Sequence, residues 1–215
     1  MKFSNDVLEY GPLVVFRICC GPLDSLCYLV VERESGEAVL IDSGCPAEVI
    51  VRTLEDLGLQ LRLILATHTH FDHVSSARAI SEETHAPAMA HPADVEMLPR
   101  YWMPHLGEPP HLEPAVEDGK VVSLGSLKIT AIHTPGHTPG SVCYWVEEAG
   151  VIFTGDTLFK GAVGRTDFAG GDPEALRRSL SRLAALPDET VVLPGHGLDT
   201  TIGEERERLR KRGII

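Results

Sequence analysis

The sequence THTHFDH, Thr67–His73, crowds three histidines and an aspartate into seven residues, directly after the apolar run LRLILA (61–66). The apolar run predicts a buried strand. An extended segment that leaves a strand points side chains two residues apart to the same side, so His68 and His70 should converge. These two imidazoles can share one metal ion.

The second half of the same motif predicts a second centre. Asp72 and His73 lie at the turn into the next helix, where adjacent side chains diverge, so this pair can serve an ion beside the first. Imidazole and carboxylate ligands suit zinc, iron or manganese, whereas four thiolates would indicate a purely structural zinc. The competing interpretation of these seven residues alone is a solvated, histidine-rich loop.

Three further residues of the ligand type follow apolar runs later in the chain: His137 in HTPGHTPGS, Asp156 in GDTLF and His196 in PGHG. Each comes directly after a glycine, which permits backbone conformations that carry a side chain sharply out of a strand. Loops beyond a sheet edge are also where catalytic groups usually project. We therefore expect these three residues to complete a metal centre with the first cluster.

Composition limits the class of protein. The 215 residues are 43% hydrophobic and 23% charged, which predicts one globular domain over 1–215. A formal net charge of −12 argues against a nucleic-acid partner, which requires clustered Lys and Arg. The first residues lack the basic start and apolar core of a secretory signal, and no apolar run approaches the ~20 residues of a membrane span. We expect a cytoplasmic protein without a membrane partner.

The five cysteines are odd in number and include no Cys-x-x-Cys pair. This pattern argues against a disulfide framework and against a thiolate zinc site. Cys19, Cys20, Cys27, Cys45 and Cys143 are therefore predicted to be free thiols, most of them buried as small apolar residues.

Strands and helices alternate along the chain, which predicts an α/β fold. Apolar runs predict strands at 13–18, 27–32, 38–42, 61–67, 127–133, 142–147, 151–156 and 190–195, and helical periodicity predicts helices over 47–57, 74–84, 173–186 and 203–212. Asp172 can cap the third helix, with Pro173 in its first turn. The proline-rich stretch 98–119 is expected to be a loop over a functional face.

A repeated strand–helix–strand pattern, here called the internal echo, suggests that the chain has two similar halves. A strand ending at Asp42, a helix and a strand ending before His68 are repeated later as a strand ending at Asp156, a helix and a strand ending before His196.

These motifs resemble the metallo-β-lactamase-fold superfamily and, within it, the glyoxalase II group. THTHFDH matches the superfamily motif T-H-x-H-x-D-H, while HTPGHTPGS, GDTLF and PGHG match its later ligand loops. The resemblance implies a four-layer αββα sandwich. It also implies two divalent metal ions, for which we expect zinc, with iron or manganese as alternatives.

The resemblance assigns the ligands. It places His68, His70 and His137 on one ion, Asp72, His73 and His196 on the other, and Asp156 between them. Asp42, in IDSG, falls where the superfamily has an aspartate beneath the ligands that orients imidazoles. We take Asp72 and Asp156 as the catalytic carboxylates. Two ions about 3.5–4 Å apart lower the pKa of a shared water toward ~7 and hold hydroxide as a nucleophile.

The predicted substrate is a small-molecule glutathione thioester such as S-lactoylglutathione. A thiolate leaving group, of parent pKa near ~8.5, needs little general-acid help. Full-length glyoxalase II adds a C-terminal helical domain that binds glutathione, but only residues 197–215 follow His196, so the resemblance is to the short, single-domain branch. Lys160 and Arg165 are the predicted substrate-binding cations, although Arg165 could instead pair with Asp167 or Asp172.

Two other functions stay open at this point. GRTDF also resembles the persulfide dioxygenases, in which a single ferrous iron on His68, His137 and Asp156 would activate O₂ toward glutathione persulfide. A metal-binding fold without catalysis is disfavoured because no expected ligand is missing. Hydrolysis of another ester, a lactone or a phosphodiester also fits the ligand set.

The remaining histidines, His85, His91, His105, His111 and His133, lack the spacing of ligands and are expected to be solvated or hydrogen-bonded in place. Tyr101, Trp102 and Met103 could line a substrate mouth, but aromatic residues more often pack under their own loop.

Overall fold

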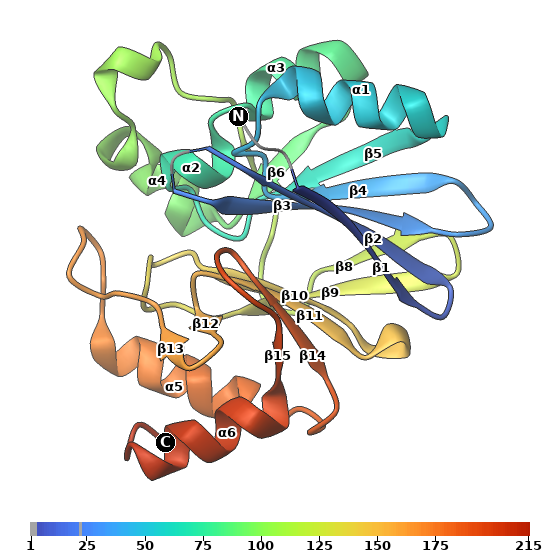
Figure 1. Cartoon of the computed structure of the whole chain (residues 1–215). Helices are drawn as coiled ribbons and strands as arrows, with labels where there is room; N and C mark the ends of the chain where they lie inside the picture. The colour runs from blue at the N-terminus through green and yellow to red at the C-terminus, as the bar shows by residue number, and fades with distance from the viewer. Residues whose placement is uncertain (1–3, 22) are drawn as a thin grey trace.

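The computed structural model describes residues 4–21 and 23–215, whose strands form two large facing sheets (Figure 1). The first sheet follows chain order: β1 (Ser4–Tyr10), β2 (Leu13–Cys20), β3 (Ser25–Glu32), β4 (Glu37–Ile41), β5 (Gln60–Leu65), β6 (Ala88–Ala90) and β7 (Glu113–Pro114). The second has the order β15 (Thr200–Thr201), β14 (Val191–Pro194), β11 (Val151–Gly155), β10 (Val142–Val146), β9 (Leu127–His133) and β8 (Val121–Leu124). A small hairpin of β12 (Leu158–Phe159) and β13 (Ala162–Val163) stands apart.

Helices cover the outer face of each sheet (Figure 1). The helices on the side of the first sheet are α1 (Ala47–Leu57), α2 (Phe71–Val74), α3 (Ala77–Thr84) and α4 (Pro92–Tyr101). The second sheet is covered by α5 (Pro173–Leu183) and α6 (Ile202–Lys211), and two 3₁₀ turns complete the elements, η1 (Pro104–Leu106) and η2 (Glu147–Ala149). The predicted αββα sandwich is confirmed.

Strand β3 shows how the sequence builds these layers. Every residue of SLCYLVVE is buried, because the strand is covered on both faces. Successive side chains alternate between two cores. Cys27, Leu29 and Val31 pack toward the helices with Ile50 of α1. Leu26, Tyr28 and Val30 pack between the sheets, against residues of the second sheet that include Phe153.

The internal echo corresponds to two strand–helix–strand units, one in each sheet. In the first, β4 and β5 are parallel and joined through α1; in the second, β11 and β14 are parallel and joined through α5. Parallel strands bring their carboxyl ends to the same sheet edge. Asp42 and His68 follow the first pair, while Asp156 and His196 follow the second.

Helix predictions agree with the structure at most boundaries. The helix over 47–57 is observed unchanged, and the predicted 203–212 is α6. Asp172 caps α5 by accepting hydrogen bonds from the main-chain N–H of Glu174 and Ala175, as expected. The helix predicted over 74–84 is observed as α3 over 77–84; its start differs because a break at residues 75 and 76 separates α3 from the short α2.

The stretch 98–119 is not one loop. Its first four residues complete α4, and η1 and β7 interrupt the rest. The sequence does not predict α4, because prolines such as Pro92 and Pro99 usually interrupt helices. Pro92 nevertheless occupies the first turn, where a missing N–H costs nothing.

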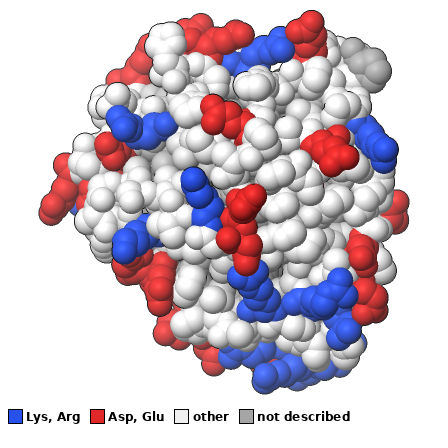
Figure 2. Space-filling view, turned by 180° about the vertical axis from the view of Figure 1, so that it is seen from behind, with Lys and Arg blue, Asp and Glu red and all other residues white. Residues whose placement is uncertain are grey.

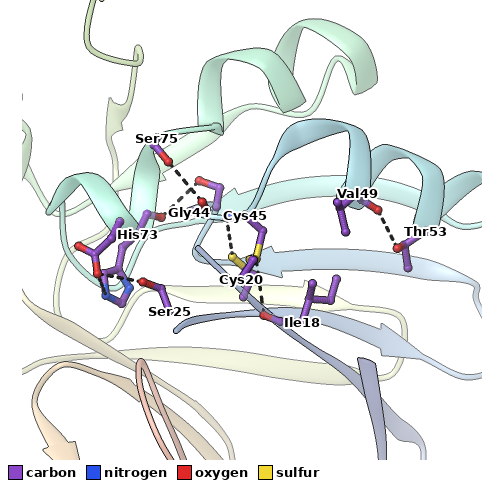
Figure 3. Close-up of a disulfide and its surroundings, with 12 residues drawn as sticks. Ile18, Cys20, Ser25, Gly44, Cys45, Val49, Thr53, His73 and Ser75 are labelled. Atoms are coloured by element: carbon purple, nitrogen blue, oxygen red, sulfur yellow. Dashed lines mark hydrogen bonds and ion pairs between the residues drawn. A yellow bond between two sulfur atoms is a disulfide. The ribbon is translucent and has the colours of Figure 1, made fainter. Parts of the chain in front are cut away.

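The cysteine prediction is wrong for one pair. Cys20, at the end of β2, and Cys45, just before α1, form a disulfide with Cα atoms 5.5 Å apart (Figure 3). Cys19, Cys27 and Cys143 are free thiols, as expected. An odd count and the absence of Cys-x-x-Cys say nothing about two cysteines that β2 and the loop after β4 bring together. The disulfide lies beside the loop that carries Gly44 (Figure 3).

Acidic and basic side chains are interspersed over the face shown in Figure 2, with basic groups most frequent along its lower edge. Helix α6 lies at the bottom of the molecule in Figure 1, and its cations are partly balanced within the helix by Arg208–Glu204, Arg208–Glu205 and Lys211–Glu207 pairs. No helix among the described residues is both long and apolar enough to cross a bilayer.

Candidate metal centre

Strand ends bring all seven predicted ligands into one cluster. Within it, three sets have ligand atoms within 4.8 Å of one another: His68, His70 and His137; His68, His73 and Asp156; and Asp72, His73 and His196. These sets overlap, so the ligands form a continuous centre between the two sheets' strand ends. The predicted ligands therefore meet, although they come from positions up to 128 residues apart in the chain, from His68 to His196.

The first set contains three histidines and is here called the three-histidine site: His68, His70 and His137. His137 Nε2 lies 3.0 Å from His70 Nδ1. The ring of His68 packs edge-on against the rings of both other histidines, at centroid distances of 4.8 and 4.9 Å. Three nitrogen ligands thus face one small volume.

The second set, here called the aspartate site, consists of Asp72, His73 and His196. His196 Nε2 lies 3.3 Å from His73 Nε2 and 3.3 Å from Asp72 Oδ2. Asp156 lies between the two sites, because its Oδ2 is 3.6 Å from His137 Nε2 while its Oδ1 is 3.5 Å from His73 Nε2. Its position is that of a bridging carboxylate.

Hydrogen bonds at the far side of three rings aim their Nε2 atoms into the centre. His137 Nδ1–H donates to the Arg165 carbonyl at 2.8 Å, and His196 Nδ1–H donates to the Leu23 carbonyl at 3.0 Å. A carbonyl can only accept, so Nδ1 carries the proton in each ring and Nε2 presents a lone pair. His73 Nδ1 is likewise 2.8 Å from the Asp42 carboxylate. Such outer contacts fix the tautomer and orientation of metal-binding histidines.

The donor set fits divalent metal ions. His68 Nε2 and Asp156 Oδ1 are buried and have no hydrogen-bond partner among the described residues. A buried polar atom without a partner is costly, and the lone pair of His137 Nε2 faces the same volume. A cation beside His68 Nε2 and Asp156 Oδ1 removes this cost. Mixed imidazole and carboxylate donors are those that zinc, iron and manganese accept.

Electrostatics keep the first two histidines neutral. Burial lowers the pKa of His68 well below its usual range, and the neighbouring imidazoles lower it further. Burial and the imidazoles of His137 and His73 lower the pKa of His70 to about 3. Both side chains therefore present lone pairs at neutral pH, which is the form that binds a metal.

Asp42 supports the centre from beneath. Its carboxylate accepts hydrogen bonds from the main-chain N–H of Thr67 at 2.7 Å and from the Thr67 hydroxyl at 2.8 Å, besides its contact with His73. Its backbone has φ of 59°, an unusual value for a residue other than glycine. Gly44, two residues after Asp42, packs against the Asp72 carbonyl. A side chain there would clash, because a Cβ on Gly44 would lie only 1.6 Å from the carbonyl oxygen.

A cavity of about 470 Å³ opens over the metal centre. Its non-ligand lining is mostly apolar and consists of Leu23, Phe71, Arg100, Tyr101, Met103, Phe168 and Ala169. Tyr101 and Met103 thus do line a mouth, whereas Trp102 is tucked under its loop and donates to the Gly107 carbonyl.

The predicted substrate cations do not line this cavity. Lys160 is exposed in the turn between β12 and β13, and Arg165 makes a bidentate ion pair with Asp167 at 2.9 and 2.6 Å. The Arg165 guanidinium also lies 4.4 Å from the ring centroid of Phe168, which does line the cavity. Arg165 therefore contacts the site in two indirect ways: its carbonyl accepts from His137, and its guanidinium packs on Phe168. The cation on the cavity wall is Arg100, which has no ion pair among the described residues.

Three further contributors were missed from sequence. Ser25 donates to Asp72 Oδ2 at 2.9 Å, the Leu23 carbonyl holds His196, and buried Asp94 binds both loops that carry the three-histidine site. None of these residues stands in a ligand-like motif, and a serine or a carbonyl carries no signal of its own. The five histidines expected to be uninvolved belong to none of the candidate metal groups found among residues 4–21 and 23–215.

Comparison with known proteins agrees with this architecture. Residues 20–196 match the sequence profile of the metallo-beta-lactamase superfamily. The hydroxyacylglutathione hydrolase GloC of Haemophilus influenzae is 33% identical over 208 residues, covering 93% of this chain and 94% of GloC.

Two crystal structures have similar folds. TTHA1623, solved in a di-iron-bound form, is 38% identical with a TM-score of 0.79, covering 88% of this chain and 96% of the other. The B3 metallo-beta-lactamase BLEG-1 is 33% identical with a TM-score of 0.76, covering 89% and 95% of the two chains. With its sandwich fold, its ligand cluster and these similarities, the chain belongs to the metallo-beta-lactamase superfamily.

Proposed function

We propose that this protein is a metal-dependent hydrolase that cleaves thioesters, with a glutathione thioester such as S-lactoylglutathione as its substrate and zinc as its metal. The observation that carries the proposal is the lining of the cavity. Apart from the metal ligands, the only titratable side chains among its described lining residues are Arg100 and Tyr101. Neither is suited to protonate a leaving group.

The two titratable side chains are poor acids for different reasons. The Arg100 guanidinium does not lose its proton in proteins. Burial raises the pKa of Tyr101 above its usual value, and its hydroxyl already donates to the Ala169 carbonyl at 3.0 Å. A leaving group must therefore depart without a proton from these residues. A thiolate, of parent pKa about 8.5, does so far more readily than an alkoxide or an amide anion.

Bound divalent ions would supply an activated water and polarise an acyl carbonyl. The chain's own residues prepare the site for that chemistry. Asp42 and the carbonyls of Arg165 and Leu23 orient imidazole lone pairs, and Ser25 fixes one oxygen of Asp72. A substrate bound against the apolar wall would displace water above the centre, which would strengthen electrostatic interactions within it.

The cavity also favours a particular kind of thioester. Leu23, Phe71, Met103 and Phe168 offer apolar contact to the carbon skeleton of a substrate, while Arg100 offers a guanidinium fork to a carboxylate. Glutathione carries two carboxylates, and GloC, a relative of similar length, is named for hydrolysis of a hydroxyacylglutathione. A carboxylate-bearing thiol is therefore the leaving group that we propose.

A persulfide dioxygenase is the second candidate. His68, His137 and Asp156 could hold a single ferrous iron, since Asp156 Oδ2 lies 3.6 Å from His137 Nε2 and Asp156 shares a candidate group with His68. Iron is also the metal bound in the TTHA1623 structure. Hydrolysis of another ester or a lactone would use the same centre, but an alkoxide is the poorer leaving group without an acid.

A leaving-group series tests the proposal. Three substrates with the same acyl group are compared on metal-loaded protein: a glutathione thioester, an oxygen ester and an amide. We expect kcat/KM to fall steeply from the thioester to the oxygen ester and again to the amide, because no side chain protonates the departing atom. Equal turnover of the oxygen ester or the amide would contradict the assignment.

A further inference from the structure

Asp94 stands out among residues that the metal centre does not use as ligands. It lies in the first turn of α4, its side chain is fully buried, and no Lys or Arg among the described residues pairs with it. A buried carboxylate without a cation needs hydrogen-bond donors to offset its desolvation. Asp94 does not serve as the helix cap, because His91 Nδ1 fills that role by accepting from Ala93 N–H.

Its donors come from the two loops that carry the three-histidine site. Asp94 Oδ2 accepts from the main-chain N–H of Thr69 and from the Thr138 hydroxyl, both at 2.9 Å, and Oδ1 accepts from the main-chain N–H of Gly140 at 2.7 Å. The Asp94 carbonyl accepts a further hydrogen bond from the Thr69 hydroxyl at 3.0 Å. One residue therefore ties both loops together.

The positions of these donors matter because of their neighbours. Thr69 stands between His68 and His70, and Thr138 directly follows His137. The aspartate site is held differently: Asp42 contacts His73, Ser25 contacts Asp72, and the Leu23 carbonyl contacts His196. Thr69 and Thr138, which donate to Asp94, are adjacent in sequence to ligands of the three-histidine site only: Thr69 to His68 and His70, and Thr138 to His137.

We propose that Asp94 is a positioning residue that holds His70 and His137 in register and so sets the metal affinity of the three-histidine site alone. Asp42 already steadies His68, because Thr67 bonds to Asp42 and lies 3.1 Å from His68 Nδ1. His70 has no comparable contact to Asp42. The close fit of the second loop supports the same role, since a Cβ on Gly140 would lie within 2.7 Å of Asp94 atoms.

The substitution Asp94→Asn removes charge while keeping shape. Each carboxylate oxygen of Asp94 accepts one main-chain N–H, from Thr69 or from Gly140. In asparagine, one of these oxygens is replaced by an NH₂ group, which cannot accept a hydrogen bond, so either orientation of the amide loses one of the two bonds. One loop therefore loses its anchor. Thr138→Val is a milder second variant that removes one donor and leaves the carboxylate.

Glu32→Gln is the matched control. Glu32 also accepts from a main-chain N–H, that of Ser35 at 2.8 Å, and from a hydroxyl, that of Ser126 at 3.1 Å. It stands at the opposite end of β3 from Ser25, which touches the centre.

The experiment titrates Co²⁺ into each metal-free protein and follows the visible spectrum and the stoichiometry. Wild type and Glu32→Gln should bind two equivalents with unchanged affinities. Asp94→Asn should weaken one of the two equivalents about 10–100-fold, the usual effect of losing an outer hydrogen bond at a metal site, and Thr138→Val should weaken the same one less. The spectrum of Asp94→Asn at one equivalent should match that of His70→Ala and differ from that of His196→Ala.

Two outcomes would overturn the inference: wild-type affinity for both equivalents in Asp94→Asn and Thr138→Val, or equal weakening of both equivalents. The inference rests on the metal centre of the proposed function. Because the readout is metal binding, a result against Asp94 is separate from a result against thioester hydrolysis.

Discussion

At the residue scale, candidate ligands are held by groups that are not ligands themselves: Ser25 donates to Asp72, and Asp94 accepts from the main-chain N–H of Thr69 beside His70. In the sequence, His68, His70 and Asp72 stand out because they lie together in one short motif. The groups that hold them do not stand out. Ser25 and Asp94 act through contacts made only after distant strands and helices pack, so their roles follow from the fold and from no local pattern.

The first prediction concerns His68→Ala. The imidazole is buried at a strand end, and its Nε2 has no other partner among the described residues, so its main loss should be metal binding with most of the fold kept. We expect bound metal and kcat to fall together, with far-ultraviolet circular dichroism unchanged. His105→Ala, which removes an exposed histidine outside the ligand groups, is the control. Wild-type turnover and metal content in His68→Ala would remove it from the centre.

The second prediction compares two arginines. Arg100 lines the cavity without an ion pair among the described residues, whereas Arg165 pairs with Asp167. A charge-assisted hydrogen bond to an unreactive part of the substrate contributes roughly 1.5–3 kcal/mol. Arg100→Ala should raise KM about 10–100-fold for S-lactoylglutathione with kcat little changed.

Arg165→Ala should change KM much less than Arg100→Ala, because its fork is already occupied by Asp167. Steady-state kinetics of both variants decide between them. A large KM effect in Arg165→Ala alone would restore the sequence-based assignment of Arg165 as the substrate anchor.

At the element scale, the strand–helix–strand echo predicts where the ligands gather. Both parallel pairs, β4 with β5 and β11 with β14, deliver their ligands to one edge. Apolar runs predict eight of the strands, β2 to β5, β9 to β11 and β14, and the Asp172 cap predicts the start of α5. The strands β1, β6, β7, β8, β12, β13 and β15 were not predicted; most of them are short. The sequence could not show that α4 runs through the proline-rich region, nor that β2 brings Cys20 to Cys45, because tertiary packing decides both.

The third prediction concerns this disulfide, which closes a loop with a sequence separation of 25. A cross-link of that span restricts the unfolded chain and typically stabilises by about 3–4 kcal/mol. The double variant Cys20→Ala/Cys45→Ala should lose about that much free energy of unfolding in urea. Cys143→Ala, a buried free thiol, controls for the lost side-chain volume.

Reducing agent should lower the stability of the wild type and leave the double variant unchanged. Mass spectrometry after thiol alkylation under non-reducing conditions should find three reactive thiols in the unfolded wild type. Five thiols, or a stability indifferent to reductant, would show that Cys20 and Cys45 are not bonded.

At the scale of the whole molecule, the candidate metal centre lies between the two halves of the sandwich and draws its candidate ligands from both. His68 and His73 follow the first sheet, whereas Asp156 and His196 follow the second. Ions that bind ligands from both sheets bind the folded state and not the unfolded chain, so they should stabilise the entire fold.

The fourth prediction follows from this linkage. A free metal concentration 100 times the Kd adds about 2.7 kcal/mol to the free energy of unfolding, and in a chain of this size each kcal/mol shifts Tm by about 2–4 °C. Chelation should therefore lower Tm by about 5–10 °C, and returning Zn²⁺ should restore it. The shift should shrink in His68→Ala. An unchanged Tm after complete metal removal would show that the ions do not link the sheets.

The most direct test of the central claim is a paired assay on one sample of measured metal content. Thiol release from S-lactoylglutathione and O₂ uptake with glutathione persulfide are recorded side by side, before and after chelation. We predict metal-dependent thiol release without O₂ uptake. Metal-dependent O₂ uptake with glutathione persulfide and no cleavage of the thioester would contradict the proposed hydrolase and establish the oxidative alternative.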